Sequence, residues 1–305
     1  MRRPLFVSLF VCVAFLAATG QPLPAAPAAW PVDLKLNYTV VPNVTYSIAN
    51  DFNCKLDVYA RNPRGTVAPT VVYIHGGGWV GGTKEGAIFE LLPYLDMGFH
   101  VINVEYRLAR VSPPPAAVED CRLALRWVFE NAKLYGFDTT RIVVTGGSAG
   151  GHLALMTGML DAGAGFDASK EWDDVIPSMK VAAIVNWYGI TDAKELLDGP
   201  NRQGYAVNWF GSLPEREKVA VRVSPLTYVR AGLPPVLTIH GDNDQLVPYT
   251  QAVRLHKALT AAGVPNRLIT IPGGRHGGFT RDQMLSAYAT IREFLDQYGI
   301  RPAAR

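Results

Sequence analysis

The fold of this chain is decided by the stretch Arg141-Ile-Val-Val-Thr-Gly-Gly-Ser148-Ala-Gly-Gly-His-Leu-Ala-Leu155. It predicts a short buried strand that turns through a glycine-flanked serine into a helix, the pattern of a nucleophile elbow. Gly146 and Gly150 leave room where a Cβ would collide with a neighbouring strand or helix. The helix start would place backbone N–H groups beside the Ser148 hydroxyl, where they favour developing negative charge. The alternative is a glycine-rich turn with an incidental serine, because Gly-x-Ser-x-Gly alone is common by chance.

Strands and helices alternate on both sides of this stretch. Alternating residues at 44–48 and 55–59 predict antiparallel edge strands. Short apolar runs predict parallel strands covered on both faces at 70–74, 101–104, 181–185, 236–239 and 268–271. Apolar residues three or four apart predict helices at 116–134, 250–262 and 281–298. This alternation predicts an α/β fold with a mostly parallel, doubly wound sheet and antiparallel N-terminal edge strands.

Length and composition bound the domain organisation. With 305 residues, 49% hydrophobic and 18% charged, the chain can bury a full core. It contains no internal repeat, heptad run or low-complexity block, which favours a single domain over 29–305. Between 189 and 224 the alternation lapses in a stretch rich in Trp, Tyr, Gly and Pro. We expect a small cap-like insertion there, over the sheet edge where ligands bind in such folds.

The N-terminus resembles an export signal. Met1-Arg-Arg-Pro precedes an apolar run over 5–18 that is too short to span a bilayer comfortably. Residues 1–28 are therefore predicted to be a signal peptide cleaved after Ala28, with Gly20 as the alternative site and an uncleaved anchor as the alternative reading. The protein would then be periplasmic or extracellular, with no stable membrane span.

The charge and the cysteines of the chain indicate which partners and which disulfide to expect. The signal peptide carries two of the arginines behind the formal charge of +3, so no basic patch suited to nucleic acid or an anionic membrane is expected in the mature chain. Cys54 and Cys121 could pair in an exported protein, but separately buried thiols are favoured because nothing in the sequence brings them together. The oligomeric state is left open.

A serine nucleophile needs an oxyanion hole. The strand at 70–74 runs into His75-Gly-Gly-Gly-Trp79, whose absent side chains let backbone amides approach a substrate oxygen. The hole is assigned to the amides of Gly77, Gly78 and Ala149. His75 is expected to brace the loop rather than act as the base, and Trp79 is either core or a wall of the substrate site.

The acid and the base are expected at later strand ends. Asp244, in His240-Gly-Asp-Asn-Asp244-Gln-Leu-Val-Pro248, is favoured over Asp242, which is expected to bond turn amides. Asp192 lies in the preceding loop and is expected to cap or form a turn. His276, in Pro272-Gly-Gly-Arg-His276-Gly-Gly-Phe279, lies in a glycine-flanked loop that can reach the site. Three other histidines, His100, His152 and His256, are expected to pack or lie at the surface.

The sequence gives little support to a metal site or a dinucleotide site. Metal binding is not expected, because the chain has no His-Glu-x-x-His or Cys-x-x-Cys motif and its histidines are dispersed. Gly76-Gly-Gly-Trp-Val-Gly81 matches a dinucleotide-binding fingerprint, and Glu105 ends the next strand. Against that alternative, Trp79 is bulky where a pyrophosphate should approach, and Asp244 and His276 would be unexplained. No cofactor is therefore expected.

At these motifs the chain resembles the α/β-hydrolase superfamily, and within it the hormone-sensitive-lipase-like esterases and their bacterial feruloyl-esterase-like relatives. The likeness extends over about 44–298, and the order Ser148, Asp244, His276 is that of the fold. The resemblance implies a serine carboxylesterase with this catalytic triad. One departure is Gly147, where many lipase-like members carry Asp or Glu. The His-Gly-Gly-x-Trp motif is also similar to that of kynurenine formamidases, which keeps an amide hydrolase of the arylformamidase or exopeptidase type as an alternative.

The resemblance also suggests substrates. Members of the bacterial branch are often exported and act on acetyl or feruloyl esters of plant polysaccharides, so a small or polysaccharide-linked ester is expected. Aromatic residues in or beside the irregular segment could form a wall for an aryl acyl group or a sugar: Trp187, Tyr188, Tyr205, Trp209 and Phe210. Trp79, Tyr188 and Trp209 are the candidate substrate-binding residues. The alternative is that these aromatic residues form only the core of the insertion. Outside the enzymes, the alternative is a protein of the same fold that binds ligands without catalysing a reaction.

Overall fold

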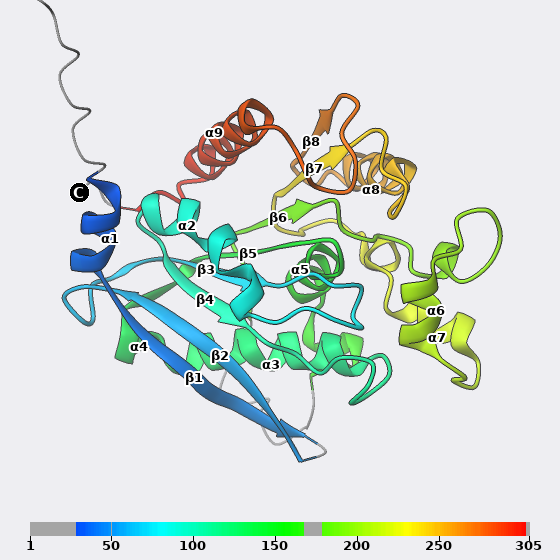
Figure 1. Cartoon of the computed structure of the whole chain (residues 1–305), viewed down its shortest axis with the longest axis horizontal. Coiled ribbons are helices and arrows are strands. Elements are labelled where there is room, and N and C mark those ends of the chain that lie inside the picture. Colours follow the sequence, from blue (N-terminus) through cyan, green and yellow to red (C-terminus); the bar gives the residue numbers. More distant parts are fainter. Residues whose placement is uncertain (1–28, 50, 168–178, 303–305) are drawn as a thin grey trace, which may run out of the picture.

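Eight strands form one sheet at the centre of the computed structural model, which describes residues 29–49, 51–167 and 179–302 (Figure 1). Their order across the sheet is β1-β2-β4-β3-β5-β6-β7-β8. β1 pairs with β2 and β2 with β4 in antiparallel register, and all the later pairs are parallel. The predicted sheet is therefore confirmed. The strands are β1 (Tyr38–Ala49), β2 (Phe52–Arg61), β3 (Ala68–Ile74), β4 (His100–Val104), β5 (Phe137–Gly147), β6 (Ala183–Trp187), β7 (Val236–Gly241) and β8 (Asn266–Ile271).

Helices cover both faces of the sheet because its strands are apolar on both sides. Val72 and Ile74 of β3 belong to one buried cluster, whereas Val71 and Tyr73 belong to another, as the pleat requires. The first cluster includes residues of α3 (Ala116–Glu130), α5 (Ala149–Met159) and α8 (Tyr249–Ala261). The second includes residues of α2 (Ile88–Asp96) and α9 (Arg281–Gln297). The result is a three-layer arrangement with the sheet in the middle.

The predicted helices appear with small changes. α8 and α9 lie within one residue of the predicted ranges, and α9 begins with a capping box in which Thr280 and Gln283 bond each other's amides. The helix predicted at 116–134 divides at Asn131 into α3 and α4 (Ala132–Tyr135). α1 (Trp30–Asn37) and α2 were not predicted. α2 contains Pro93, and α1 has no buried residue, so neither gives the usual periodic signal.

The insertion predicted at 189–224 is helical in part. It contains α6 (Gly204–Phe210) and α7 (Arg216–Arg222), which lie together at one end of the molecule (Figure 1). Each helix has only seven residues, which is too short to show helical periodicity. Ala206 and Ala220 are fully buried in the same cluster as α3 and α5. The insertion therefore contributes to the core of the protein.

Several predictions concern burial and membranes. The signal peptide predicted at 1–28 lies outside the described residues. Cys54 and Cys121 are both buried and unbonded, as favoured from the sequence. Burial raises the pKa of the Cys54 thiol to about 12. Within the described ranges, no helix combines the length and the apolar character needed to cross a bilayer.

Candidate active site

Ser148 lies at a sharp turn between β5 and α5. Its φ of 58° and ψ of −122° are strained for a non-glycine residue, and its amide donates to the Trp187 carbonyl at 2.9 Å. A Cβ at Gly146 would lie 2.3 Å from the Ile74 carbonyl oxygen, and one at Gly150 would lie 2.1 Å from the same oxygen. Both distances are far below van der Waals contact. The predicted need for glycine on either side of the serine is confirmed.

The structure brings Ser148, His276 and Asp244 together from three strand ends. Ser148 Oγ lies 2.7 Å from His276 Nε2, and His276 Nδ1 lies 2.7 Å from Asp244 Oδ2. An ionised carboxylate can only accept, so Nδ1 carries the proton and Nε2 is left to accept from the serine hydroxyl. Asp242, the alternative acid, accepts from the Gly273 amide at 2.7 Å instead. This geometry suits proton transfer from the serine to the imidazole.

The surroundings of Asp244 keep it ionised. Its Oδ1 accepts the amides of Leu246 and Val247 at 2.8 and 2.9 Å, and its Oδ2 also accepts from His240 Nε2 at 3.1 Å. Burial acts to raise the pKa of Asp244, but hydrogen bonds from His240, His276 and Val247 outweigh it and hold the pKa well below its ordinary value. A buried negative charge at this position stabilises an imidazolium at His276. His240 was not predicted, and its only sequence signal was its place in the acid motif.

The glycine loop after β3 lies beside the serine. Gly77 and Gly78 have φ of 116° and 60°, and a Cβ at Gly77 would lie 2.1 Å from the Gly81 carbonyl oxygen. Within the described part of the chain, no hydrogen bond occupies the amides of Gly77, Gly78 or Ala149. Gly77 and Gly78 line the cavity above Ser148, and Ala149 begins α5. These amides are the candidate donors to a substrate oxyanion.

His75 supports this loop. Its Nδ1 lies 2.7 Å from the Gly76 carbonyl oxygen, and its ring stacks on Tyr106 with centroids 4.4 Å apart. Burial lowers the pKa of His75 to about 4, so the ring is neutral near pH 7. His276, and not His75, is bonded to Ser148. His75 thus has the contacts expected of a bracing residue.

A cavity of about 540 Å³ opens above the serine. Tyr73 and Glu90, which line it, were not predicted, whereas Tyr205 was predicted as part of an aromatic wall and does line it. Tyr73 is the penultimate residue of β3, so the rule that sites lie at strand ends could have found it. Glu90 on α2 gave no such signal. The remaining lining consists of six glycines together with His75, Thr83, Ala87, Ser148, Tyr188, Leu246 and His276.

Of the three predicted substrate-binding residues, only Tyr188 lines the cavity. Its ring packs edge-on against His276 with centroids 4.8 Å apart. For Trp79 and Trp209 the prediction is wrong, because the structure places them in the core. Their rings stack 4.0 Å apart, and their side chains are at most 1% exposed. Removing two large aromatic surfaces from water favours this arrangement over contact with a ligand.

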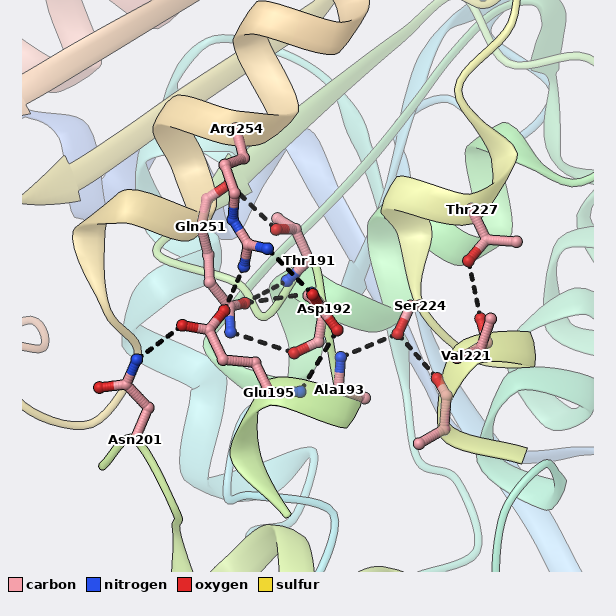
Figure 2. Close-up of polar contacts among 11 residues, drawn as sticks. Thr191, Asp192, Ala193, Glu195, Asn201, Val221, Ser224, Thr227, Gln251 and Arg254 are labelled. Atoms are coloured by element: carbon pink, nitrogen blue, oxygen red, sulfur yellow. Dashed lines mark hydrogen bonds and ion pairs between the residues drawn. The ribbon is translucent and has the colours of Figure 1, made fainter. Parts of the chain in front are cut away.

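Gln251 of α8 holds the start of the insertion in place (Figure 2). Its Oε1 accepts the amides of Thr191 and Asp192 at 2.8 and 3.1 Å, and its Nε2 donates to the Asp192 carbonyl at 3.0 Å. Arg254, one turn later, pairs with the carboxylates of Asp192 and Glu195. α8 begins five residues after Asp244, so the insertion and the acid loop share one support.

The insertion also contacts the acid loop directly. Tyr205 Oη donates to the Leu246 carbonyl at 2.9 Å, and Gln203 Nε2 donates to the Gln245 carbonyl at 3.1 Å. At its far end, Ser224 Oγ accepts the Ala193 amide at 2.8 Å (Figure 2). The insertion is therefore fixed at both ends and along its length.

The dinucleotide alternative is wrong. In such folds the glycine turn opens a helix whose N-terminus holds the pyrophosphate. Here the first α-helix after Gly81 is α2, which begins only at Ile88. Glu105, the acidic residue that this alternative needs after the next strand, instead accepts the Lys84 amide at 2.8 Å.

Across the described residues, no three His, Cys, Asp or Glu side chains are grouped to hold a metal ion.

The comparisons with known proteins point to esterases. A BD-FAE family profile matches residues 56–259. Probable carboxylic ester hydrolase LipM of Mycobacterium tuberculosis is 32% identical over 213 residues, which cover 65% of this chain and 46% of LipM. The chain spans about half the length of the first curated relatives it matches: 46% of LipM, 61% of esterase LipQ and 56% of esterase LipC, all of that organism.

Two solved structures share the architecture. The propionate-bound esterase Est2 of Thermogutta terrifontis matches with a TM-score of 0.72 and 26% identity, over 90% of this chain and 99% of Est2. A truncated carbohydrate esterase from gut microbiota matches with a TM-score of 0.69 and 27% identity, over 85% of this chain and 96% of that one.

Proposed function

This chain belongs to the BD-FAE family of α/β-hydrolases, and we propose that it hydrolyses carboxylic esters through an acyl-enzyme on Ser148. The observation that carries the proposal is the pair of 2.7 Å contacts that link Ser148, His276 and Asp244 beneath an open cavity. A binding protein would not need these three groups in hydrogen-bond contact at separate strand ends.

In the proposed reaction, His276 Nε2 takes the proton as Ser148 Oγ attacks the ester carbonyl. The oxyanion receives hydrogen bonds from the amides of Gly77, Gly78 and Ala149. His276 then gives its proton to the departing alcohol, which leaves an acyl-serine. Water, deprotonated by the same imidazole, attacks that ester and releases the acid. Asp244 holds the imidazole in the required tautomer and stabilises its positive charge.

For the substrate, we propose an acetyl ester, another short acyl ester or a feruloyl ester, for example one carried by a plant polysaccharide. The bound propionate of Est2 and the carbohydrate esterase among the structural relatives support this class. The cavity of about 540 Å³ is large enough for an aryl acyl group or a sugar ring.

The test is a substrate panel on the purified protein. Aryl acetates, a methyl ferulate ester, acetylated xylan and N-formylaniline are compared for wild type and Ser148→Ala. We expect ester hydrolysis to exceed amide hydrolysis and to fall by about three to six orders of magnitude in Ser148→Ala. An unchanged ester rate in a folded Ser148→Ala variant would refute the proposed nucleophile, and a preference for N-formylaniline would favour the amide hydrolase.

We also propose that the protein is exported, on the basis of the basic start and apolar run within residues 1–28. Mass spectrometry of the protein from its native host should give a mature chain that begins at Ala29. A chain that retains Met1 in the cytoplasm would refute export.

A further inference from the structure

Glu90 gives the cavity its charge. Among the described residues that line the cavity, it is the only carboxylate, and none of them is Lys or Arg. It is the third residue of α2 and is exposed. An acid in the first turn of a helix is favoured by the helix dipole alone. A role in the cavity therefore needs support from its neighbours.

No basic side chain neutralises Glu90. Within the described residues, it takes part in no ion pair and no hydrogen bond. Burial, and after it the Glu90 carboxylate, raises the pKa of Tyr73 well above its ordinary value, and the same two causes lead those that raise the pKa of Tyr188 to about 12. The negative charge of Glu90 therefore acts on the phenols of the cavity wall.

Those two phenols also have unused hydrogen-bonding groups. Tyr73 and Tyr188 line the cavity, and within the described part of the chain neither hydroxyl is hydrogen-bonded. A Cβ at Gly147 or Gly277 would lie 3.2 or 3.1 Å from Tyr188 Oη, so this hydroxyl sits between the elbow and the histidine loop. The Tyr205 hydroxyl, in contrast, is already bonded to the acid loop.

We propose that Glu90, Tyr73 and Tyr188 form a substrate subsite that selects a hydrogen-bond-donating or cationic group and disfavours a carboxylate. A hydroxyl or ammonium group can donate to the Glu90 carboxylate and the phenol oxygens, and a cation also gains from the aromatic faces. A carboxylate is repelled by Glu90 and by ionised Asp244, with no lining Lys or Arg to offset the repulsion. The subsite rests on the proposed esterase function, because it would orient the ester over Ser148.

The experiment uses matched 4-nitrophenyl esters whose acyl chains have one length and end in methyl, hydroxyl, trimethylammonium or carboxylate. The acetates of choline and of its uncharged isostere 3,3-dimethylbutanol probe the alcohol side. We expect kcat/KM of wild type for the cationic ester to exceed that for the anionic ester by at least about tenfold. Glu90→Gln should reduce this ratio by about tenfold.

Two comparisons make the test specific. Glu293→Gln removes the same charge from the exposed face of α9, where Glu293 faces Arg267 at 3.8 Å, and should leave the ratio unchanged. Tyr73→Phe should weaken the preference for the hydroxyl ester over the methyl ester by a few fold while the cationic preference persists. An unchanged ratio in Glu90→Gln, or an equal change in Glu293→Gln, would overturn the subsite.

Binding separates this proposal from the esterase proposal. Phenyltrimethylammonium and benzoate are titrated by calorimetry into Ser148→Ala, with and without Glu90→Gln. Tighter binding of the cation that is lost in Glu90→Gln would support the subsite even if no ester in the panel is hydrolysed. Equal binding of the two ions would refute the subsite, whatever the esterase result.

Discussion

The two sides of the site are held in place by different means. On the elbow side, the backbone around Ser148 is packed directly against other backbone, and glycine at 146 and 150 is required because a Cβ would meet the Ile74 carbonyl oxygen. On the acid side, Asp244 is held by hydrogen bonds from side chains and amides, and the insertion beside it is anchored by Gln251 and Arg254. Substitutions on the elbow side should therefore chiefly lower the free energy of unfolding, whereas those on the acid side should chiefly lower kcat.

His152 of α5 joins the two sides. Its Nδ1 accepts from the Trp79 indole at 3.1 Å, so its proton lies on Nε2, which donates to the Val223 carbonyl of the insertion at 2.6 Å. The ring is fully buried. The neutral tautomer thus connects the elbow helix, the glycine loop and the insertion. Substitutions on the elbow side, on the acid side and at His152 can therefore test the difference between the two sides.

The largest expected effect is on the acid side. Asp244→Asn should lower kcat by about 10⁴-fold, because the amide no longer holds the His276 tautomer or stabilises its charge. Folding, measured by circular dichroism and thermal unfolding, should persist. Asp242→Asn is the matched control and should change kcat by no more than a few fold. A larger loss of kcat in Asp242→Asn than in Asp244→Asn would contradict this assignment and indicate Asp242 as the acid.

On the elbow side, Gly150→Ala should destabilise the protein by about 3 kcal/mol or more, because the added Cβ would lie 2.1 Å from a backbone oxygen that cannot move away freely. Gly204→Ala is the control. A Cβ there meets no atom within 4 Å, and the change should be neutral or stabilise by up to about 1 kcal/mol. Chemical denaturation measures both variants, and equal stabilities for the two would contradict the packing argument.

At the junction, acid should weaken the fold. Burial lowers the pKa of His152 to about 4, so the unfolded chain takes up this proton first as the pH falls below 6.5. The contribution of neutral His152 to the free energy of unfolding is therefore complete above pH 6.5. It decreases by about 2–3 kcal/mol as the pH falls toward 4. Unfolding free energies at pH 7 and pH 4.5 should differ less in His152→Gln than in wild type. Other buried groups with lowered pKa values, among them His75, His100 and Asp244, would cause the pH dependence that remains in the variant.

The smallest expected effect is at the clamp in Figure 2. Gln251→Leu leaves the amides of Thr191 and Asp192 without their acceptor, and should cost about 1–2 kcal/mol of stability. A several-fold loss in kcat should accompany it if the insertion supports the acid loop. Val253→Ala, at an exposed site on the same helix, should change neither quantity appreciably. If Gln251→Leu behaves like Val253→Ala, the clamp does not position the site.

The same contrast explains what the sequence could predict. The elbow was predictable because only glycine fits beside Ser148, so the physical constraint is visible as a residue type. The positions of Asp244 and His276 followed from the rule that functional groups gather at the carboxyl ends of parallel strands. The structure places both there, within hydrogen-bond distance of one another.

Side chains that act through packing were harder to predict. The sequence shows that Trp79 and Trp209 are aromatic but not that they stack on each other and leave the cavity. Glu90 reaches the cavity because α2 begins where it does, and α2 was itself missed because of its length and Pro93. The seven-residue helices α6 and α7 gave no periodic signal, so the contact of Tyr205 with the acid loop could not be foreseen.

The central claim is that Ser148 is a nucleophile activated by His276, and covalent labelling tests it most directly. The protein is treated with a fluorophosphonate probe, digested, and the modified peptide is sequenced by mass spectrometry. We predict a single label on Ser148 that is absent in Ser148→Ala and formed much more slowly in His276→Ala. A label on another residue, or labelling that persists in Ser148→Ala, would contradict the claim.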